Sequence, residues 1–431
     1  MKKPNVILVL YYTRGVYPLR DAIRTHLYCW QEYSSYRYIY VNVAFGFPWN
    51  LLRKVRIAGV IYHTKFLAMR WSPSIFQERT ALCAPLADLD VPKIAMPQDE
   101  FIHTDMLAEF LARHRITHLF TCAEEADWRK IYGRFLDFTR TKVRTVLTGY
   151  IDERTRIRVD RMKRRARQRA KDIGYRAWKA AYWLGEHGQN KVRVAEVVGA
   201  AAECRGLSLD ISQRDQDVLS GDDWFRFLLD CRATVGVQGG ASVLDHDGSI
   251  KATVEDYVKE HPDKSFEEVR AACFPGRDHE LGLACISPRH FEACMTETCQ
   301  ILVEGHFNGI LEPWKHYIPV KTDYSNVDQA LDALQDRERT EQMVRQAYRD
   351  VVGSGRWTYR TFVRETEATV FDEPSLPRMD LRSWYCYLFF RLRDWLLWRF
   401  IHLEVMALFT RKRSRPIRVA HRYALRFLPA P

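Results

Sequence analysis

Short apolar runs that end in polar residues, with helical patterns between them, are the feature that most constrains the fold of this chain. In the first half, these runs cover residues 5–12, 37–45, 58–62, 91–96, 117–122 and 145–151. Helical patterns separate most of them, for example over residues 106–114. Short buried strands that alternate with helices are typical of a parallel α/β sheet.

The second half of the chain repeats this alternation. Strands are predicted at residues 206–211, 233–238 and 300–304, with a helix at 192–205 and a long polar helix at 328–351. A second α/β domain is therefore predicted. The length of 431 residues fits two or three domains.

The cysteines and the first residues of the chain indicate the cellular compartment in which the protein is expected. None of the 10 cysteines forms a CxxC pair, which favours reduced thiols in a cytosolic protein over disulfides or a zinc site. The apolar run near the start is short and holds two tyrosines, so a first strand is a better interpretation than a signal peptide. No stretch of about 18 residues lacks a charge, and no transmembrane helix is expected.

The net charge of +12 is concentrated in two segments. Residues 154–171 and 378–431 each carry a net charge of +9, so the rest of the chain is slightly acidic. For 154–171, three interpretations stay open: a solvated helix, a phosphate-facing wall, or a nucleic-acid patch. The lack of aromatic residues there disfavours binding of single strands by stacking.

The second basic segment is rich in tryptophan, tyrosine and phenylalanine. Apolar stretches edged by tryptophan and arginine suit a helix that lies in a membrane interface, where anionic lipid attracts the basic residues. The alternative is an amphipathic helix packed on the protein or on a second subunit.

Polar residues follow each predicted strand of the first half. In parallel sheets, ligands bind beyond the carboxyl ends of the strands. The residues concerned are Arg14 and Gly15, His63, Gln98 to Glu100, and Glu124 and Glu125. Any single one of them also suits a helix cap.

Residues 287–334 carry the most specific pattern in the chain. There Ser287, Arg289 and His290 open a helix that contains Glu292, and a strand and a further helix follow. This order resembles the donor-binding region of GT-B glycosyltransferases, most closely the spore-coat and capsule-type group of family 1/4-like enzymes. The resemblance covers about residues 172–363, whereas the N-terminal half matches only in architecture.

The resemblance implies an α/β fold of two Rossmann-like domains that face a cleft. It implies an acceptor domain at residues 1–165, a nucleotide-sugar donor domain at 166–355 and a crossover helix back to the first domain at 356–377. The residues of the second basic segment add a C-terminal amphipathic helical tail, basic and aromatic, at 378–431.

The resemblance also implies a donor site without a metal or cofactor, because basic groups and a helix N-terminus suit a diphosphate. The implied donor-binding residues are Arg176, Lys191, Gly240, Ser287, Arg289, His290 and Glu292, with Glu292 holding the ribose hydroxyls. In the family, a second glutamate lies eight residues before this one, where the present chain has Ala284. Donor identity and stereochemistry therefore stay open.

A proton acceptor for the acceptor hydroxyl is expected at the strand ends of the first domain. Asp99 is the first choice, with Glu100 and His63 as further candidates, and Arg14 and Gly15 are expected to contact the acceptor. His63 and His103 are otherwise interpreted as ordinary surface or capping histidines.

Asp245 and Asp247 are spaced like the DxD metal motif of GT-A glycosyltransferases. The Gly248 that follows favours a polar turn instead, because two α/β domains give the motif no GT-A context.

The predicted function is transfer of a sugar from a nucleotide-diphosphate donor to a glycan or lipid-linked acceptor in cell-surface polysaccharide or glycoconjugate synthesis. The protein is expected in the cytoplasm, peripherally on the inner face of the plasma membrane, without a specific nucleic acid and with its oligomeric state open. A non-catalytic nucleotide-sugar-binding scaffold and a nucleic-acid-binding protein are the competing hypotheses.

Overall fold

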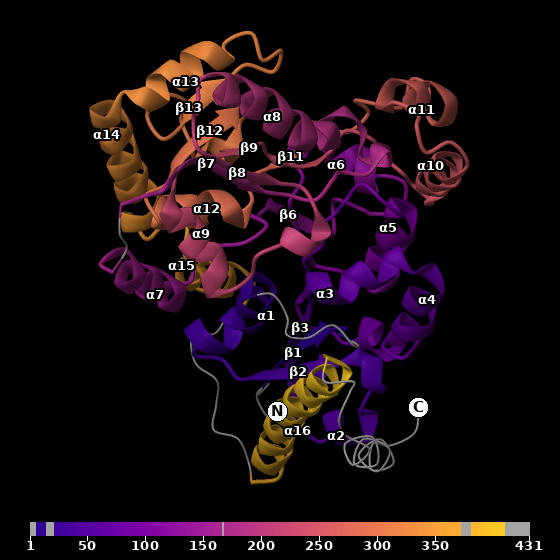
Figure 1. The fold of residues 1–431 in the computed structure, drawn as a ribbon. Coiled ribbons are helices and arrows are strands. Elements are labelled where there is room, and N and C mark those ends of the chain that lie inside the picture. The colour runs from indigo at the N-terminus through magenta and orange to yellow at the C-terminus, as the bar shows by residue number, and fades with distance from the viewer. Residues whose placement is uncertain (1–5, 14–20, 166–167, 372–380, 410–431) are drawn as a thin grey trace.

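The computed structural model describes residues 6–13, 21–165, 168–371 and 381–409. It consists of two α/β domains and a long C-terminal helix, as Figure 1 shows. Arg14 and Gly15, which were predicted to contact the acceptor, lie outside the described residues.

The first domain is built on a six-stranded parallel sheet with the order β2-β1-β3-β4-β5-β6. Its strands are β1 (Val6–Tyr11), β2 (Tyr38–Asn42), β3 (Ile57–Tyr62), β4 (Lys93–Ala95), β5 (His118–Thr121) and β6 (Lys142–Thr145). Its helices are α1 (Asp21–Tyr33), α2 (Trp49–Leu52), α3 (Thr64–Leu67), α4 (Pro73–Ala81), α5 (Thr104–Arg113), α6 (Glu125–Tyr132) and α7 (Glu153–Lys163).

Successive side chains of β1 point to opposite faces of the sheet, and helices cover both faces. Val6, Leu8 and Leu10 pack in one core with residues of α3, α4 and α5. Ile7 and Val9 face the opposite core, which α1 and the late helix α15 (Tyr359–Val370) complete. The chain therefore returns to the first domain after the second one has been formed.

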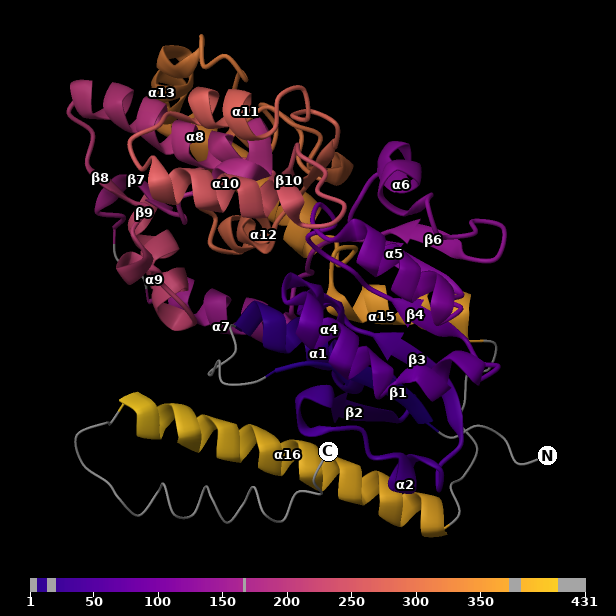
Figure 2. The same ribbon diagram turned by 90° about the vertical axis from the view of Figure 1, so that its right-hand side faces the viewer.

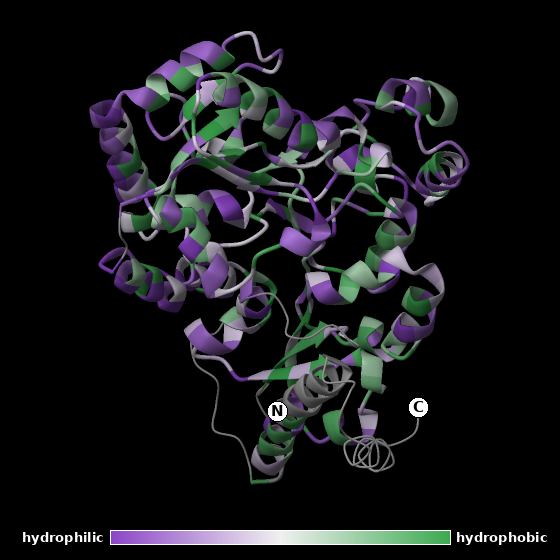
Figure 3. Cartoon of the chain, viewed as in Figure 1, coloured by the Kyte–Doolittle hydropathy of each residue, from purple (hydrophilic) through white to green (hydrophobic). Residues whose placement is uncertain are grey.

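The second domain has a five-stranded parallel sheet with the order β13-β12-β9-β7-β8. The strands are β7 (Lys171–Arg176), β8 (Leu209–Ser212), β9 (Cys231–Gly236), β12 (Cys299–Val303) and β13 (Ile318–Val320). The helices beside it are α8 (Gly185–Cys204), α9 (Asp222–Asp230), α12 (Pro288–Met295), α13 (Val327–Gln335) and α14 (Arg337–Ala347). Two parallel sheets covered by helices confirm the predicted fold class, and Figure 3 shows their strands as mostly apolar.

A helical excursion of the second domain joins it to the first. It comprises β10 (Gly239–Ala241), α10 (Ser249–Glu260), α11 (Phe266–Cys273) and β11 (Leu283–Cys285). The backbone N–H of Asp245 donates to the carbonyl of Phe101 over 2.8 Å, and apolar residues of the excursion share the core of the first domain. The two domains are thus held together along one side.

The Asp245–Gly248 segment caps α10. The Asp245 carboxylate accepts backbone hydrogen bonds from Gly248 and Lys251, and Asp247 accepts one from Ser249, all at 2.9 Å. The segment is therefore a polar turn, as favoured above, but it starts a helix and does not connect two strands.

Two element predictions need correction. The run at 145–151 was predicted as a strand, but β6 ends at Thr145 and the later apolar residues Leu147 and Ile151 pack against the second domain. The predicted helix at 328–351 is broken at Asp336, whose extended backbone ends α13 and whose side chain caps α14 by accepting from the N–H of Arg339.

The C-terminal helix α16 (Leu381–Phe409) lies along the β2 side of the first domain, as Figure 2 shows. Phe390 and Cys386 are buried in the core of that domain. Among the helices described, none is long and apolar enough to cross a membrane.

Candidate active site in the cleft between the domains

A cavity of about 580 Å³ lies between the two domains. Ala177 and Val237, which directly follow β7 and β9, line it from the second domain, and Asp99 lines it from the segment after β4. The cavity therefore lies at the carboxyl ends of parallel strands, where α/β proteins bind their ligands.

Asp99 is positioned by a buried arginine in the first domain. The guanidinium of Arg70 donates to the carbonyl oxygens of Leu67 and Ile102 at 3.1 Å, of Gln98 at 2.6 Å and of Asp99 itself at 2.5 Å. These bonds hold the loop in which Asp99 adopts a left-handed backbone with φ 54°. Such a conformation is rare outside glycine and persists only where its surroundings enforce it.

The Asp99 carboxyl is accessible from the cavity but lies deep among protein atoms. Loss of hydration raises its pKa above 3.8, while Arg70, Lys191 and Lys65 oppose that rise. A carboxylate with a raised pKa is a suitable proton acceptor.

Lys191 on α8 faces the same cavity from the second domain. Burial lowers its pKa, and the nearby Cys285 and Asp99 oppose that effect. Lys191 and Asp99 therefore influence each other electrostatically across the cleft, although they belong to different domains.

Arg289 lies in the first turn of α12, beside Lys191. Its guanidinium lies over the ring of Trp224, 5.3 Å from the centroid, and donates to the carbonyl oxygen of Arg176. The charge of Lys191 lowers the pKa of Asp99, and that of Arg289 lowers the pKa of Glu292. Lys191 and Arg289 together give this wall of the cavity a positive charge.

The first turn of α12 is fixed by the side chains that precede and follow it. Nδ1 of His290 lies 3.1 Å from both the backbone N–H and the hydroxyl of Ser287, and 3.2 Å from the carbonyl oxygen of the same residue. Burial lowers the pKa of His290 to about 4, which keeps the ring neutral near pH 7. Both residues line the cavity, and the helix N-terminus adds a positive dipole end.

Glu292 lies in an adjoining cavity of about 290 Å³, which shares Ala177, Trp224, Ser287 and Arg289 with the first. Its carboxylate accepts a hydrogen bond of 2.7 Å from the indole N–H of Trp224. Burial raises its pKa, and the Trp224 bond and Arg289 oppose this. The predicted role at the ribose hydroxyls stays a prediction.

Arg176 and Gly240 have structural roles at the rim. The Arg176 guanidinium pairs with Asp210 over 2.7 Å and lies 4.4 Å from the centre of the Phe227 ring, while its Nε is buried without a hydrogen-bond partner. Gly240 lines the cavity with φ 136°, and a Cβ there would lie 1.8 Å from the carbonyl oxygen of Leu283. Arg176 also lines the adjoining cavity that contains Glu292, and its predicted contact with the donor stays a prediction.

Glu100 does not reach the cleft. It is fully buried and accepts hydrogen bonds from Thr121, Tyr132 and the N–H of Cys122. Burial raises its pKa to about 7, against the effect of these bonds.

His63 is also fully buried, at the N-terminus of α3. Its Nδ1 accepts from the N–H of Lys65, and its Nε2 lies 2.7 Å from Nδ1 of His26. Burial holds its pKa well below 6.5. The alternative interpretation as a capping residue describes His63 better than a role as a base.

Sequence reasoning missed Arg70 and the aromatic lining of the cavity. Trp71, Phe101, Trp178 and Trp183 all line it. Two of these tryptophans follow β7 within eight residues, and so many aromatic residues directly after a strand could have identified this loop as part of the site. No feature of the sequence around Arg70 indicated that it belongs to the site.

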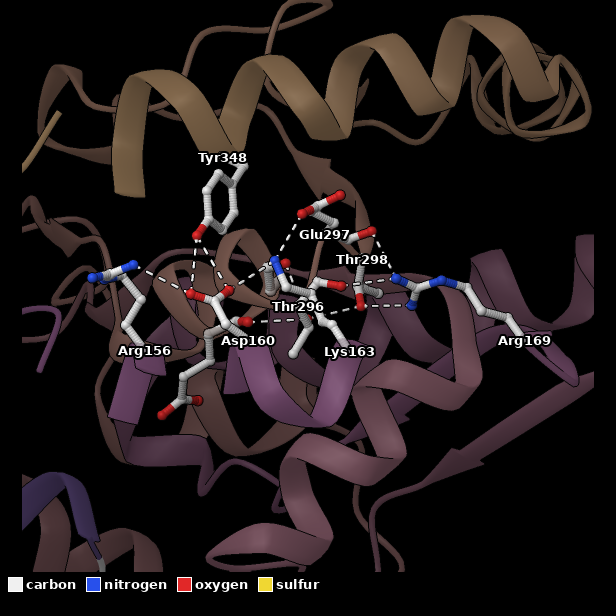
Figure 4. A network of polar contacts seen from close by, with 10 residues as sticks. Arg156, Asp160, Lys163, Arg169, Thr296, Glu297, Thr298 and Tyr348 are labelled. Atoms are coloured by element: carbon white, nitrogen blue, oxygen red, sulfur yellow. Dashed lines mark hydrogen bonds and ion pairs between the residues drawn. The ribbon is translucent and has the colours of Figure 1, made fainter. Parts of the chain in front are cut away.

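Part of the basic segment 154–171 is engaged in polar contacts within the protein, as Figure 4 shows for Arg156, Lys163 and Arg169. Lys163 pairs with Asp160 and Glu297 at 3.1 and 2.7 Å. Arg169 donates to the carbonyl oxygens of Leu228, Cys231, Thr296 and Glu297 and to the hydroxyl of Thr298. These contacts join α7 and the linker to the second domain, so much of the segment has a bracing role.

One group of residues in the described part of the chain has ligand atoms close enough to hold a metal ion, namely Glu186, Asp278 and His279. Arg270 lies 3.9 Å from both carboxylates, which already balances part of their charge. None of the three lines the cavity between the domains.

No family model and no curated protein matches this sequence. Among solved structures, the chain is similar to HepE from Anabaena in complex with UDP (9% identity, TM-score 0.43, 85% of this chain and 99% of that chain). It is also similar to TarM (9% identity, TM-score 0.42, 73% of this chain and 55% of that chain). A third similar structure is AviGT4, a glycosyltransferase involved in avilamycin A biosynthesis (12% identity, TM-score 0.34, 85% of this chain and 97% of that chain). The chain thus spans about half the length of TarM, and such low similarity does not assign it an activity.

Proposed function

We propose that this protein is a glycosyltransferase of GT-B architecture that transfers a sugar from a nucleotide-diphosphate donor to a hydroxyl group of a glycan or lipid-linked acceptor. One observation carries the proposal: an acidic group, Asp99, faces Lys191 and Arg289 across a cavity between two Rossmann-like domains. Cell-surface polysaccharide or glycoconjugate synthesis is the process in which we place it.

The two walls of the cavity suit the two halves of such a reaction. The bond between the sugar C1 and the donor diphosphate breaks, and a new bond forms between C1 and the acceptor oxygen. Asp99 takes the proton of the acceptor hydroxyl, because an alcohol attacks well only as its proton leaves. Lys191, Arg289 and the N-terminus of α12 stabilise the negative charge that develops on the leaving diphosphate.

In this proposal no metal ion is required. A divalent cation serves other nucleotide-sugar enzymes by neutralising the diphosphate, and here the cationic side chains of Lys191 and Arg289 at the cavity offer the same neutralisation.

We further propose that α16 attaches the protein peripherally to the inner face of the plasma membrane from the cytoplasm. One face of α16, with Ser383, Cys386 and Phe390, packs against the first domain. The other face is exposed and apolar, with Leu381, Trp384, Tyr385, Leu388, Phe389, Leu392, Trp395 and Leu396. Their spacing of three and four residues makes one continuous stripe, as expected of a helix lying in an interface.

A second candidate function is a non-catalytic nucleotide-sugar-binding scaffold of a polysaccharide assembly. It is favoured by Ala284, which stands where the resembling family carries a glutamate. In the structure Ala284 pairs with Gly240 between β11 and β10, close to the cavity.

An assay of nucleoside diphosphate release separates the two functions. The full chain is incubated with UDP-, GDP-, CDP- and ADP-sugars, with and without a lipid extract of bacterial envelopes. A transferase releases diphosphate from one donor, faster when the extract is present, and this release is lost in Asp99→Asn. Binding of a donor without release would favour the scaffold, and neither binding nor release would contradict both.

A further inference from the structure

A third cavity, of about 480 Å³, lies where α1, α7 and α16 meet. It shares Asp21, Thr25, Asp152 and Thr155 with the cavity that contains Glu292. That cavity in turn shares Arg289 and Ser287 with the one that contains Lys191 and Asp99. The three cavities therefore form a continuous series from the candidate active site to the C-terminal helix.

The charges around this third cavity are balanced. Four carboxylates and four guanidinium groups line it: Asp21, Glu32, Asp152, Asp394, Arg24, Arg154, Arg158 and Arg391. Several of them are paired with each other, as in Arg154–Glu32 and Arg158–Asp21. A phosphate would meet as many acids as bases here, so the site is poorly suited to an anion.

Balanced donors and acceptors suit a neutral polyhydroxyl ligand. Each sugar hydroxyl both donates and accepts a hydrogen bond, and carboxylates accept where guanidinium groups donate. The apolar face of a sugar ring also needs an apolar surface, which Tyr28, Tyr33 and Trp395 offer in the same cavity.

The C-terminal helix provides one wall of this cavity and is fixed there by a buried contact. The Asp394 carboxylate accepts hydrogen bonds from the hydroxyls of Tyr11 at 2.7 Å and Tyr28 at 2.9 Å. Trp395, one residue further, lines the cavity and is 55% exposed, whereas Trp384 and Leu388 on the same helix are 42% and 43% exposed and do not line it. Thus α16 contributes both to the cavity and to the apolar stripe.

We propose that this cavity is a distal subsite for a neutral sugar unit of the acceptor, beside the surface through which α16 meets the membrane. The proposal rests on the proposed transferase function and adds to it the class of acceptor: a glycan chain long enough to extend from α16 to Asp99.

The test is binding of the full-length protein to an array of immobilised neutral hexose oligosaccharides. Two variants remove one tryptophan each from the same helix, Trp395→Ala inside the cavity and Trp384→Ala outside it. We expect Trp395→Ala to weaken oligosaccharide binding by about tenfold, Trp384→Ala to leave it unchanged, and both variants to bind nucleoside diphosphates like the wild type.

Three results would overturn the subsite: binding to none of the oligosaccharides, an equal effect of the two variants, or displacement by inorganic phosphate and not by free oligosaccharide. Failure of the proposed function would look different, because the wild type would then bind no nucleoside diphosphate, or would bind a donor without releasing diphosphate from it. Nucleotide titration and the release assay on the same samples keep the two outcomes apart.

Discussion

The two walls of the cleft carry opposite charges, and they reach this state in different ways. In the first domain, the Arg70 cation is consumed by four backbone carbonyls and serves to position the Asp99 carboxylate. In the second domain, Lys191 and Arg289 line the cavity, where their charges can reach a ligand. The comparison shows that a cationic side chain near the cleft can bind a ligand only if the protein does not already use its charged group elsewhere.

The largest expected effect comes from removing the acidic wall. Asp99→Asn keeps the shape of the side chain but cannot accept the acceptor proton, so we expect kcat to fall by about 10²- to 10⁴-fold. Donor affinity should stay within about twofold, because the opposite wall is intact. Steady-state kinetics and nucleotide titration measure the two quantities, with Asp90→Asn, on an exposed loop, as the control. An unchanged kcat in Asp99→Asn would remove Asp99 from the mechanism.

The substitution Arg70→Met tests whether Arg70 holds the loop that carries Asp99. This change leaves four carbonyls without their donor, and we expect the free energy of unfolding to fall by about 3 kcal/mol. The activity that remains should show a lowered kcat with little change in donor affinity, because the Asp99 loop is released. Denaturant unfolding measures the first effect, and the exposed Arg53→Met is the control. Stability and kcat equal to those of the wild type would contradict the positioning role.

The basic wall is tested by comparing two neighbouring arginines. Arg289→Met should weaken nucleoside diphosphate binding by about ten- to a hundredfold, because a charge-assisted hydrogen bond is lost. Arg176→Met should change this affinity little, because Asp210 already holds the Arg176 guanidinium. Calorimetric titration of both variants measures the two affinities. A larger loss of affinity in Arg176→Met than in Arg289→Met would show that the basic wall is wrongly assigned.

The smallest expected effect is on the pH dependence of kcat. Asp99 must be deprotonated to accept a proton, so activity is lost as the pH falls through its pKa, which burial has raised above 3.8. The positive charge of Lys65 opposes this rise. Lys65→Met should therefore move the acidic limb of the profile of kcat against pH upward by a few tenths of a pH unit. Movement to lower pH would contradict the assignment of the limb to Asp99.

Both sheets could be predicted from the sequence because their strands are short, buried and separated by helices. The strand predicted at 145–151 was misplaced because Leu147 and Ile151 are buried by packing between domains, which local periodicity does not distinguish from strand burial. The break at Asp336 was missed because a capping aspartate inside a polar stretch also suits a helix surface.

The candidate site was predictable where a pattern lies close together in sequence, as at Ser287, Arg289 and Glu292. It was not predictable where the role of a residue depends on distant partners. Arg176 is neutralised by Asp210 on the neighbouring strand, and Arg70 acts on carbonyls up to 32 residues away. In the basic segment 154–171, Lys163 and Arg169 are engaged inside the protein, and only the folded structure reveals this.

The most direct test of the central claim is calorimetric titration of the full chain with UDP, GDP, CDP and ADP. We predict one-site binding of at least one of these diphosphates without added metal. Lys191→Met should weaken this binding by about tenfold or more, whereas Arg193→Met, two residues further along α8 and outside the cavity, should not. A folded protein that binds none of the four, or that binds equally well without Lys191, would contradict the assignment of this cleft as a nucleotide-sugar site.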